Sequence, residues 1–166
     1  FCRRFGLSPA RVCDAVKLPI LMMLVSRDGF EMLAYIEESR DWINEEAISQ
    51  AVGIEGEGAF KAVGYLLSKK PHLKPNAKAA AKALYRGCFD MLDLIYPTAE
   101  TFEKSPTFLV EAANAFPYLG AQALSYLFKR GYTPDDRLPD GRSLLDYAIA
   151  RGDAGLQAYL LSLGVK

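Results

Sequence analysis

Two residues of the sequence have the chemistry of a nucleophile and a base, Cys88 and His72. Cys88 follows Gly87 at the expected start of a helix, where a thiol is most readily activated. His72 is the only histidine and lies in a Lys- and Pro-rich stretch, residues 69–75, between expected helices. A nucleophile also needs a base in reach and a group that orients the base, and no such group is recognisable. The sequence therefore predicts no catalytic residue, with Cys88 a small packing residue and His72 a loop residue.

No pattern in the sequence indicates a metal or a cofactor, and we expect none. The three cysteines, Cys2, Cys13 and Cys88, are too few and too scattered for a disulfide framework or a zinc site. The glycine-rich stretch at residues 53–58 lacks the lysine and the preceding strand of a phosphate-binding loop. Unpaired cysteines favour a reducing, cytoplasmic compartment. No apolar run approaches the about 20 residues of a membrane span.

The charged residues are segregated along a chain whose formal net charge is zero. Residues 28–57 hold nine acidic residues against one basic residue, whereas residues 58–86 hold seven basic residues and no acidic one. Lys78, Lys82 and Arg86 recur every four residues, which places them on one face of a helix. This spacing fits either a solvated helix face or a strip that binds an acidic partner. The zero net charge argues against a protein that coats nucleic acid through bulk charge.

The elements that position these side chains are clearest in residues 140–164, DGRSLLDYAIARGDAGLQAYLLSLG. Ser143 predicts a helix N-cap, and Gly152 predicts a left-handed turn that ends this helix. A second helix follows, with Leu156 and further large apolar residues on one face, and Gly164 ends it. The segment predicts a helical hairpin with small residues on its first helix and large ones on its second.

This hairpin resembles the ankyrin repeat. Asp140-Gly141 matches the turn before the first helix, and Ser143-Leu144-Leu145-Asp146 is in register with the Thr-Pro-Leu-His of that family. Further matches are Ala148, Gly152, Leu160, Leu161 and Gly164. Leu144 and Asp146 depart from the proline and the histidine of the family pattern, so we expect a divergent repeat. The resemblance implies a stack of hairpins, each too small to bury its own apolar face alone.

Earlier segments predict the same hairpin, so we expect an all-α, ankyrin-like solenoid of about five helix-turn-helix units in a single domain. The small residue of the first helix recurs as Val25, Ala51, Ala83, Ala112 and Ala148. Their separations of 26, 32, 29 and 36 residues scatter around the about 33 residues of ankyrin units. The expected units span residues 18–44, 45–75, 76–104, 105–136 and 137–166. Residues 1–17 are expected to be a helix and the remnant of a preceding unit, and the start at Phe1 predicts a fragment of a longer chain.

Two units share a lengthening by three residues between the small residue of the first helix and the leucine of the second. In the later unit, residues 115–119 place aromatic residues near the hairpin turn, and Pro117 is expected to end the first helix. Phe116 is either an exposed contact residue or folded back into the space left by the longer connection. Trp42, beside the apolar Ile43, is expected in the core.

The resemblance places the first helices and the turns before them on a concave binding surface. In this chain that surface implies Lys82, Tyr85, Arg86, Glu111, Tyr147 and Arg151. With Lys78 of the basic face and the turn residues, the candidate partner-binding residues are Lys78, Lys82, Tyr85, Arg86, Glu111, Phe116, Tyr118, Tyr147 and Arg151. Tyrosine and arginine together are enriched at protein interfaces, so we expect a protein partner.

The function expected from these features is protein binding without enzymatic activity in this region. One alternative is binding of a polyanion, either nucleic acid or anionic lipid, through the basic block at residues 69–86, with binding that falls steeply as salt rises. Another is architectural packing against an upstream catalytic domain. The modules also resemble those of effectors that bacteria deliver into host cells, which would place the chain in the host cytosol. In the last hairpin, Leu156, Leu160 and Leu163 are expected to be partly exposed or covered by a partner.

Overall fold

The computed structural model describes residues 43–53 and 56–165. Every regular element in this part of the chain is a helix, so the all-α prediction is confirmed there. The chain divides into two compact units between Asn76 and Ala77. The helix predicted before residue 18, the hairpin predicted from Leu18 to Trp42 and the predicted core position of Trp42 lie outside the described residues.

The first unit contains one described hairpin, formed by α4 (Glu45–Gly53) and α5 (Glu57–Lys69). Asn44 caps α4, because the Ala47 N–H donates to its Oδ1 at 3.0 Å. The Lys70 ammonium donates to the Ile43 carbonyl at 2.6 Å. These contacts fix both ends of the hairpin: one satisfies an open N–H of the first turn, and the other returns the end of α5 to the start of α4.

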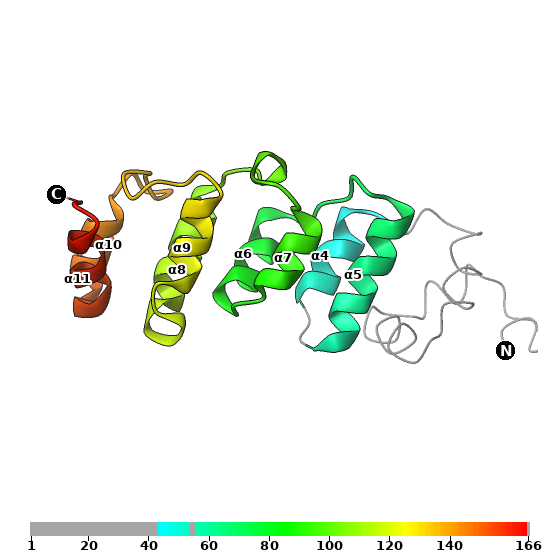
Figure 1. Ribbon diagram of the computed structural model, residues 1–166, viewed down its shortest axis with the longest axis horizontal. Helices are drawn as coiled ribbons and strands as arrows, with labels where there is room; N and C mark the ends of the chain where they lie inside the picture. The colour runs from blue at the N-terminus through cyan, green and yellow to red at the C-terminus, as the bar shows by residue number, and fades with distance from the viewer. Residues whose placement is uncertain (1–42, 54–55, 166) are drawn as a thin grey trace, which may run out of the picture. The chain divides into compact units, whose positions relative to one another are not determined.

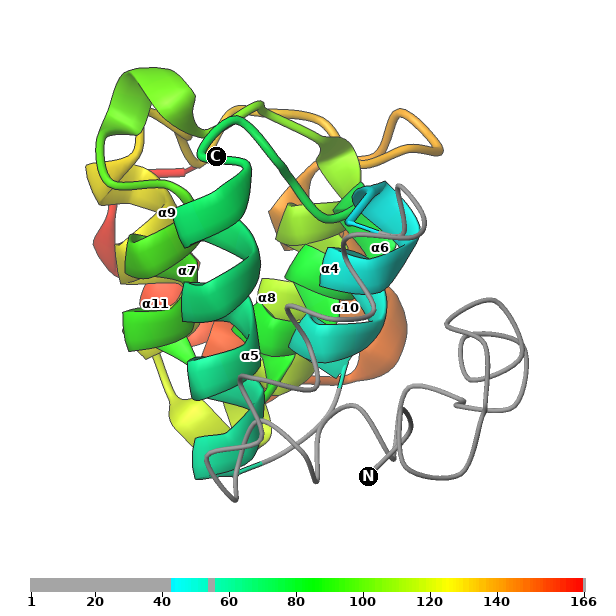
Figure 2. The same ribbon diagram turned by 90° about the vertical axis from the view of Figure 1, so that its right-hand side faces the viewer.

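The second unit contains three helical hairpins that follow one another along the chain (Figure 1). Its elements are α6 (Ala77–Tyr85), α7 (Phe89–Ile95), η2 (Ala99–Thr101), α8 (Pro106–Leu119), α9 (Gln122–Lys129), α10 (Leu144–Arg151) and α11 (Ala154–Ser162). Within this unit, α6, α8 and α10 form one layer and α7, α9 and α11 form the other (Figure 2). We call these the first and second layers. Helix α8 contacts both α6 and α10, so each hairpin packs on the next.

Buried alanines are concentrated in the first layer, as the sequence predicts, although Leu84, Leu109 and Leu144 are fully buried there too. The fully buried residues of the first layer include Ala80, Ala81, Ala83, Ala112, Ala113 and Ala148. Those of the second layer include Leu92, Leu124, Leu127, Leu156 and Leu160. Methyl side chains let neighbouring first-layer helices approach closely, while each buried leucine contributes about 1.5–3 kcal/mol through the apolar area removed from water.

The turns inside the first and last hairpins of this unit share one hydrogen-bonded form. Gly87 and Gly152 have φ values of 74° and 68°, which are left-handed. The next N–H donates back to the small residue of the first helix, Cys88 to the Ala83 carbonyl at 2.9 Å and Asp153 to the Ala148 carbonyl at 3.0 Å. These hydrogen bonds satisfy carbonyls at the C-terminus of the first helix that have no partner within the helix. The turn needs glycine because a Cβ disfavours positive φ. The predicted left-handed Gly152 is confirmed.

A second shared motif ends α9 and α11. The Tyr132 N–H donates to the Leu127 carbonyl at 3.2 Å, and the Val165 N–H donates to the Leu160 carbonyl at 3.3 Å. Both motifs pass through a left-handed glycine. Donors and acceptors are each 33 residues apart in the two motifs, so the backbone itself repeats with that period between these hairpins.

The prediction that Pro117 ends the first helix of its hairpin is wrong, because α8 continues to Leu119. Proline lacks an N–H, but in the last turn this removes a single intrahelical hydrogen bond, and its fixed φ suits a helix. The added turn also packs on the preceding hairpin, since a Cβ at Gly87 would lie 3.3 Å from Leu119 Cδ2. Packing between hairpins therefore offsets the loss of the hydrogen bond.

The three-residue lengthening that two units share occupies different helices in the structure. In the second unit it extends a first-layer helix, since α8 has 14 residues against nine in α6 and eight in α10. In the first unit the long element is the second helix of the hairpin, α5, with 13 residues, and α4 has nine. Equal spacing in the sequence therefore does not place the added residues in the same element.

Replacement of Gly152 by valine is expected to lower the free energy of unfolding by about 1–3 kcal/mol. A Cβ at this position would meet no atom within 4 Å, so the cost comes from the left-handed backbone and not from a clash. Hydrogen-exchange mass spectrometry of the α10–α11 peptides measures the loss. The matched control is Gly64→Ala in α5, where space is equally open and φ is not positive; it should stabilise by about 0.5–1 kcal/mol. Equal effects of the two changes would contradict the assigned turn.

Candidate partner-binding surface

Helix α6 presents one polar stripe to solvent. Lys78, Lys82 and Tyr85 are exposed along it, and Arg86 is exposed just after the last helical residue. The intervening alanines and Leu84 are buried. The basic residues, which are spaced four apart, therefore lie on one face as predicted, and that face is exposed to solvent.

Helix α8 continues this surface with residues one and two turns apart, Glu111, Asn114 and Tyr118. The Tyr118 side chain is 77% exposed. Its ring meets that of Tyr85 edge to face, with the ring centroids 6.2 Å apart. An exposed aromatic pair thus connects the last turns of α6 and α8.

Asn114 connects α8 to α10 by accepting two hydrogen bonds. The Tyr147 hydroxyl donates to Asn114 Oδ1 at 2.9 Å, and the Arg151 guanidinium donates to the same oxygen. The guanidinium carbons of Arg151 and Arg142 lie 5.4 and 5.3 Å from the centroid of the Tyr147 ring. The amide oxygen of Asn114 is neutral, so it orients Arg151 without cancelling its charge.

These contacts form one continuous surface across the first layer. We call it the tyrosine strip and define it as Lys82, Tyr85, Arg86, Asn114, Tyr118, Tyr147 and Arg151. It joins the last turns of three neighbouring helices and carries three cations. Glu111 lies on the same stripe of α8, half-buried. Elsewhere in the second unit, Lys104, Arg130 and Arg142 form ion pairs with carboxylates.

Besides Glu111, two more of the predicted contact residues lie outside the strip, Lys78 and Phe116. Lys78 is exposed one turn earlier on α6. Phe116 packs against the next hairpin: its ring centroid lies 5.6 Å from that of Tyr159, and a Cβ at Gly155 would lie 3.4 Å from its Cε1. Neither alternative for Phe116 describes the structure: the side chain is half-buried, and it packs on α11 of the next hairpin and not into the connection of its own.

Sequence reasoning missed two residues that organise this surface, Asn114 and Arg142. Asn114 lies three residues after Glu111, so the helical period already placed it on the same face. Arg142 lies in the turn before α10, where the ankyrin resemblance also places binding residues. Their common feature is that each contacts Tyr147.

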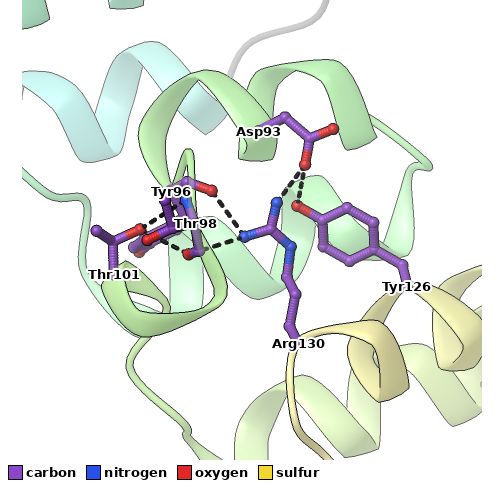
Figure 3. Close-up of polar contacts among 6 residues, drawn as sticks. All are labelled: Asp93, Tyr96, Thr98, Thr101, Tyr126 and Arg130. Atoms are coloured by element: carbon purple, nitrogen blue, oxygen red, sulfur yellow. Dashed lines mark hydrogen bonds and ion pairs between the residues drawn. The ribbon is translucent and has the colours of Figure 1, made fainter.

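A second polar cluster, the arginine clip, joins α7, α9 and the connection between α7 and α8 (Figure 3). Arg130 donates to the Tyr96 carbonyl at 2.7 Å and to the Thr98 carbonyl at 3.5 Å, and it forms an ion pair with Asp93. The Tyr126 hydroxyl donates to Asp93 Oδ1 at 2.8 Å. Burial and then this hydrogen bond raise the pKa of Tyr126 above its ordinary value. Arg130 therefore connects the end of α9 to α7 and to the connection that follows α7, and little of its side chain is exposed.

The same region contains a buried aromatic cluster centred on Phe102. The ring centroids of Phe108 and Tyr96 lie 4.8 and 4.9 Å from that of Phe102, and Tyr132 and Tyr126 lie slightly farther away. Burial raises the pKa of both Tyr96 and Tyr132 to about 12. These hydroxyls therefore stay protonated at neutral pH, and that of Tyr132 donates a hydrogen bond.

Tyr132 also fixes the start of α8. Its hydroxyl accepts from the Ser105 N–H at 2.6 Å and donates to the Ser105 carbonyl at 3.1 Å. Ser105 is the N-cap of α8 and is followed by Pro106, as the sequence predicts. Tyr132, at the end of the α8–α9 hairpin, thereby positions the start of α8.

The start of α10 is closed by a reciprocal cap. The Asp146 N–H donates to Ser143 Oγ at 3.0 Å, while Asp146 Oδ2 accepts from the Ser143 hydroxyl at 2.7 Å and from its N–H at 3.3 Å. These hydrogen bonds lower the pKa of Asp146, and the one from the Ser143 side chain lowers it most. The predicted Ser143 cap is confirmed, and Asp146 takes part in it.

Ser143→Ala should cost about 1 kcal/mol of unfolding free energy at neutral pH. Because the folded-state pKa of Asp146 is lowered, the contribution of its carboxylate is present above its ordinary pKa and is lost as pH falls through the lowered value. The difference between wild type and variant should therefore shrink below about pH 4. Urea unfolding followed by circular dichroism at neutral and acidic pH measures it. A difference that stays constant with pH would show that Asp146 contributes nothing through its charge.

The last hairpin exposes a different set of apolar residues from the one expected. Leu156 and Leu160 are fully buried between the helices, so the expectation that they lack cover is wrong. Leu163 is exposed as expected, and so are Ile149 and Leu161. Leu156 and Leu160 are one turn apart, so they share the inward face of α11. The expectation groups them with Leu163 as residues without cover inside the hairpin.

The two residues considered for catalysis lie in separate units. His72 is exposed in the loop after α5, and Cys88 is half-buried before α7. In the described ranges, 43–53 and 56–165, no three His, Cys, Asp or Glu residues gather closely enough to hold a metal ion. Over the same ranges, no helix combines the length and the apolar character needed to cross a membrane.

Comparisons with known proteins were made for the whole sequence. No family model, no curated protein and no solved structure matches it.

Proposed function

We propose that this chain is a protein-binding module, built as a divergent ankyrin-type stack, and that its partner binds the tyrosine strip without chemical change. The observation that carries the proposal is a pair of contacts between neighbouring hairpins, Tyr85 with Tyr118 and Asn114 with Arg151, whose members on α8 lie one turn apart on the same face. It places exposed aromatic rings and cations from three consecutive hairpins on one surface. Tyrosine and arginine are the residue types that contribute most to binding at protein interfaces.

Three features support the ankyrin-type stack. The hydrogen-bonded glycine motifs after α9 and α11 recur after 33 residues, close to the period of the family. First-layer helices are packed through alanine. The Ser143–Asp146 cap keeps a hydrogen-bonded helix start where the family has threonine and histidine. A stack of this kind is rigid enough to hold side chains from different hairpins at fixed spacing.

The strip is also well prepared to bind. Arg151 is held by Asn114 and lies over the Tyr147 ring, so it loses little side-chain freedom when a partner arrives. Tyr85 and Tyr118 already contact one another in the same way. Pre-ordered side chains lower the entropic cost of binding, which allows a modest surface to bind specifically.

Selection from a library of random dodecapeptides displayed on phage tests this function. We expect the wild-type chain to enrich ligands whose binding is lost in the double variant Lys82→Glu and Arg86→Glu. The matched control is Lys129→Glu, an equally exposed charge reversal at the end of α9 in the other layer, and it should leave binding intact. If no ligand is enriched, or if the control loses binding equally, the proposal fails.

The same variants decide between a protein partner and a polyanion. Single-stranded DNA and phosphatidylserine vesicles serve as probes at low and at physiological salt. Polyanion binding would fall steeply as salt rises and would depend on charge alone. The strip presents an aromatic pair as well as cations, so we expect its binding not to depend on charge alone. These probes should therefore bind the wild-type chain no more tightly than they bind the double variant. Tight, strongly salt-dependent binding would favour the polyanion instead.

A further inference from the structure

Resting on the function proposed above, we infer the chemical class of the ligand. The tyrosine strip fits an extended acidic peptide in which one apolar or aromatic side chain lies between two acidic ends. The inference goes beyond a binding surface, because it specifies the charge, the length and the order of the ligand's side chains.

The order follows from which residue each helix contributes. The end of α6 supplies Lys82 in its last turn and Arg86 just after it. The last turn of α8 supplies Tyr118, and the last turn of α10 supplies Arg151. Tyr118 contacts Tyr85, so the aromatic pair lies between the two cationic ends. A ligand that crosses the three helices therefore meets positive charge, then aromatic surface, then positive charge.

The length follows from helix packing. Neighbouring packed helices lie about 8–10 Å apart, so α6 and α10 are separated by about 20 Å. An extended chain rises about 3.3 Å per residue, so about six residues connect the two cationic ends. Acidic residues about six positions apart, with the apolar residue near the middle, match both the order and the span.

Charge complementarity selects acidic ends in particular. The strip carries three cations, Lys82, Arg86 and Arg151, against one carboxylate on the same face of α8, Glu111, so positive charge is in excess. The hydrogen-bond partner that orients Arg151 in the strip is the neutral amide of Asn114, which leaves its charge for a ligand carboxylate. Asp140 and Asp146 lie nearby in sequence, but the first pairs with Arg142 and the second closes the cap with Ser143. A basic ligand would face like charges at both ends.

The aromatic pair selects an apolar centre. Tyr118 is the most exposed of the large hydrophobic side chains of the second unit, yet its ring is held edge-on by Tyr85. A phenylalanine ring placed here gains a second aromatic contact and covers exposed carbon surface. A polar residue at the same position would gain neither.

Fluorescence anisotropy with four labelled octapeptides tests the inference on the full chain. The reference peptide is Glu-Glu-Ser-Phe-Ser-Ser-Glu-Glu. One matched peptide carries glutamine for every glutamate, another carries serine for phenylalanine, and the last carries lysine for every glutamate. We expect the glutamine and lysine peptides to bind at least about tenfold more weakly than the reference, and the serine peptide several-fold more weakly.

Protein variants locate the contacts. Arg151→Gln and Tyr118→Ser should each weaken the reference peptide several-fold, whereas Lys129→Glu should not. Equal binding of the glutamate and glutamine peptides, or no binding of the reference peptide, overturns the inference. So does equal weakening by Lys129→Glu, since it would show that charge attracts the peptide without a site.

The two proposals fail separately. If the phage library enriches ligands at the strip that lack the acidic–apolar–acidic order, the binding function stands and the inferred ligand class is wrong. If the reference peptide binds the strip while the library enriches nothing, the ligand class stands as a chemical property of the strip and the proposed biological function is wrong.

Discussion

Replacing Arg130 with alanine is expected to lower the free energy of unfolding of the second unit by about 2–3 kcal/mol. The side chain of Arg130 is only 11% exposed, and it donates to the Tyr96 and Thr98 carbonyls. Its guanidinium carbon also lies 4.6 and 5.2 Å from the ring centroids of Tyr126 and Phe102. Alanine leaves the Tyr96 carbonyl without this donor and removes both ring contacts.

The size of this effect depends on which contact of Arg130 dominates. The Asp93 side chain is 55% exposed, so the ion pair is screened by water and contributes little. The part-buried hydrogen bond to the Tyr96 carbonyl and the contacts with the two rings carry most of the effect, because the hydrogen bond to the Thr98 carbonyl is long and exposed. Arg130→Lys, which keeps the charge but not the planar fork, should therefore recover only part of the loss.

Hydrogen-exchange mass spectrometry of peptides from α7 and α9 is the suitable measurement. The single tryptophan of the chain, Trp42, precedes the second unit, so tryptophan fluorescence would not report on it directly. Lys129→Ala is the matched control, because this neighbouring residue of α9 is exposed, and it should change stability by less than about 0.5 kcal/mol. An Arg130→Lys variant as stable as wild type would show that charge alone matters and would contradict the clip.

Phe102→Ala should have the larger effect, about 3–5 kcal/mol, because it opens a cavity at the centre of the aromatic cluster. Phe102 is buried and contacts the rings of Tyr96, Phe108 and Tyr132 as well as the Arg130 guanidinium. It lies in the connection between two hairpins, so its loss removes packing that α7, α8 and α9 share. Urea unfolding monitored by far-ultraviolet circular dichroism, with hydrogen exchange to localise the change, measures it.

Two comparisons make this result specific. Phe102→Leu keeps most of the volume and should cost less than about 1.5 kcal/mol. Tyr118→Ala removes an aromatic ring of similar size that is largely exposed, so it should scarcely alter stability while it weakens ligand binding. The double variant Phe102→Ala with Arg130→Ala should be less destabilised than the sum of the single variants, since the two residues contact each other. Additive losses would separate the clip from the cluster.

Local features of the fold are those that sequence reasoning predicts correctly. The Ser143 cap and the left-handed Gly152 are both present. Each depends on hydrogen bonds between residues at most five apart, so residue type and spacing suffice to predict it. The period of the small residues in the first layer belongs to the same class, because each hairpin repeats one local pattern.

The prediction at Pro117 fails for a reason that local rules do not contain. The rule counts the lost N–H and ends the helix. It does not count Leu119, which packs on Gly87 of the preceding hairpin, more than thirty residues earlier in the chain. The placement of the three-residue lengthening is similar, because spacing alone does not distinguish a longer first helix from a longer second one.

The candidate site was predicted residue by residue but not as an arrangement. Lys82, Tyr85, Arg86 and Arg151 are exposed as expected from helical periodicity. Their connection through Tyr118 and Asn114 depends on how far each hairpin is displaced from the last and on the rotamers that result. The role of Arg130 was missed for the same reason, since its partners lie 32 to 37 residues away.

By itself, the sequence determined the all-α character of the described part of the chain, its capped helical hairpins, the exposed basic stripe of α6 and the buried alanines of the first layer. These properties follow from periodicity and from hydrogen bonds within one turn of helix. Only the tertiary structure decided that Phe116 packs on the next hairpin while Tyr118 stays exposed, that Tyr85 and Tyr118 meet, and that Arg130 closes a clip. Those outcomes depend on contacts between hairpins, where distances of a few ångström select one of several rotamers that the local sequence allows equally.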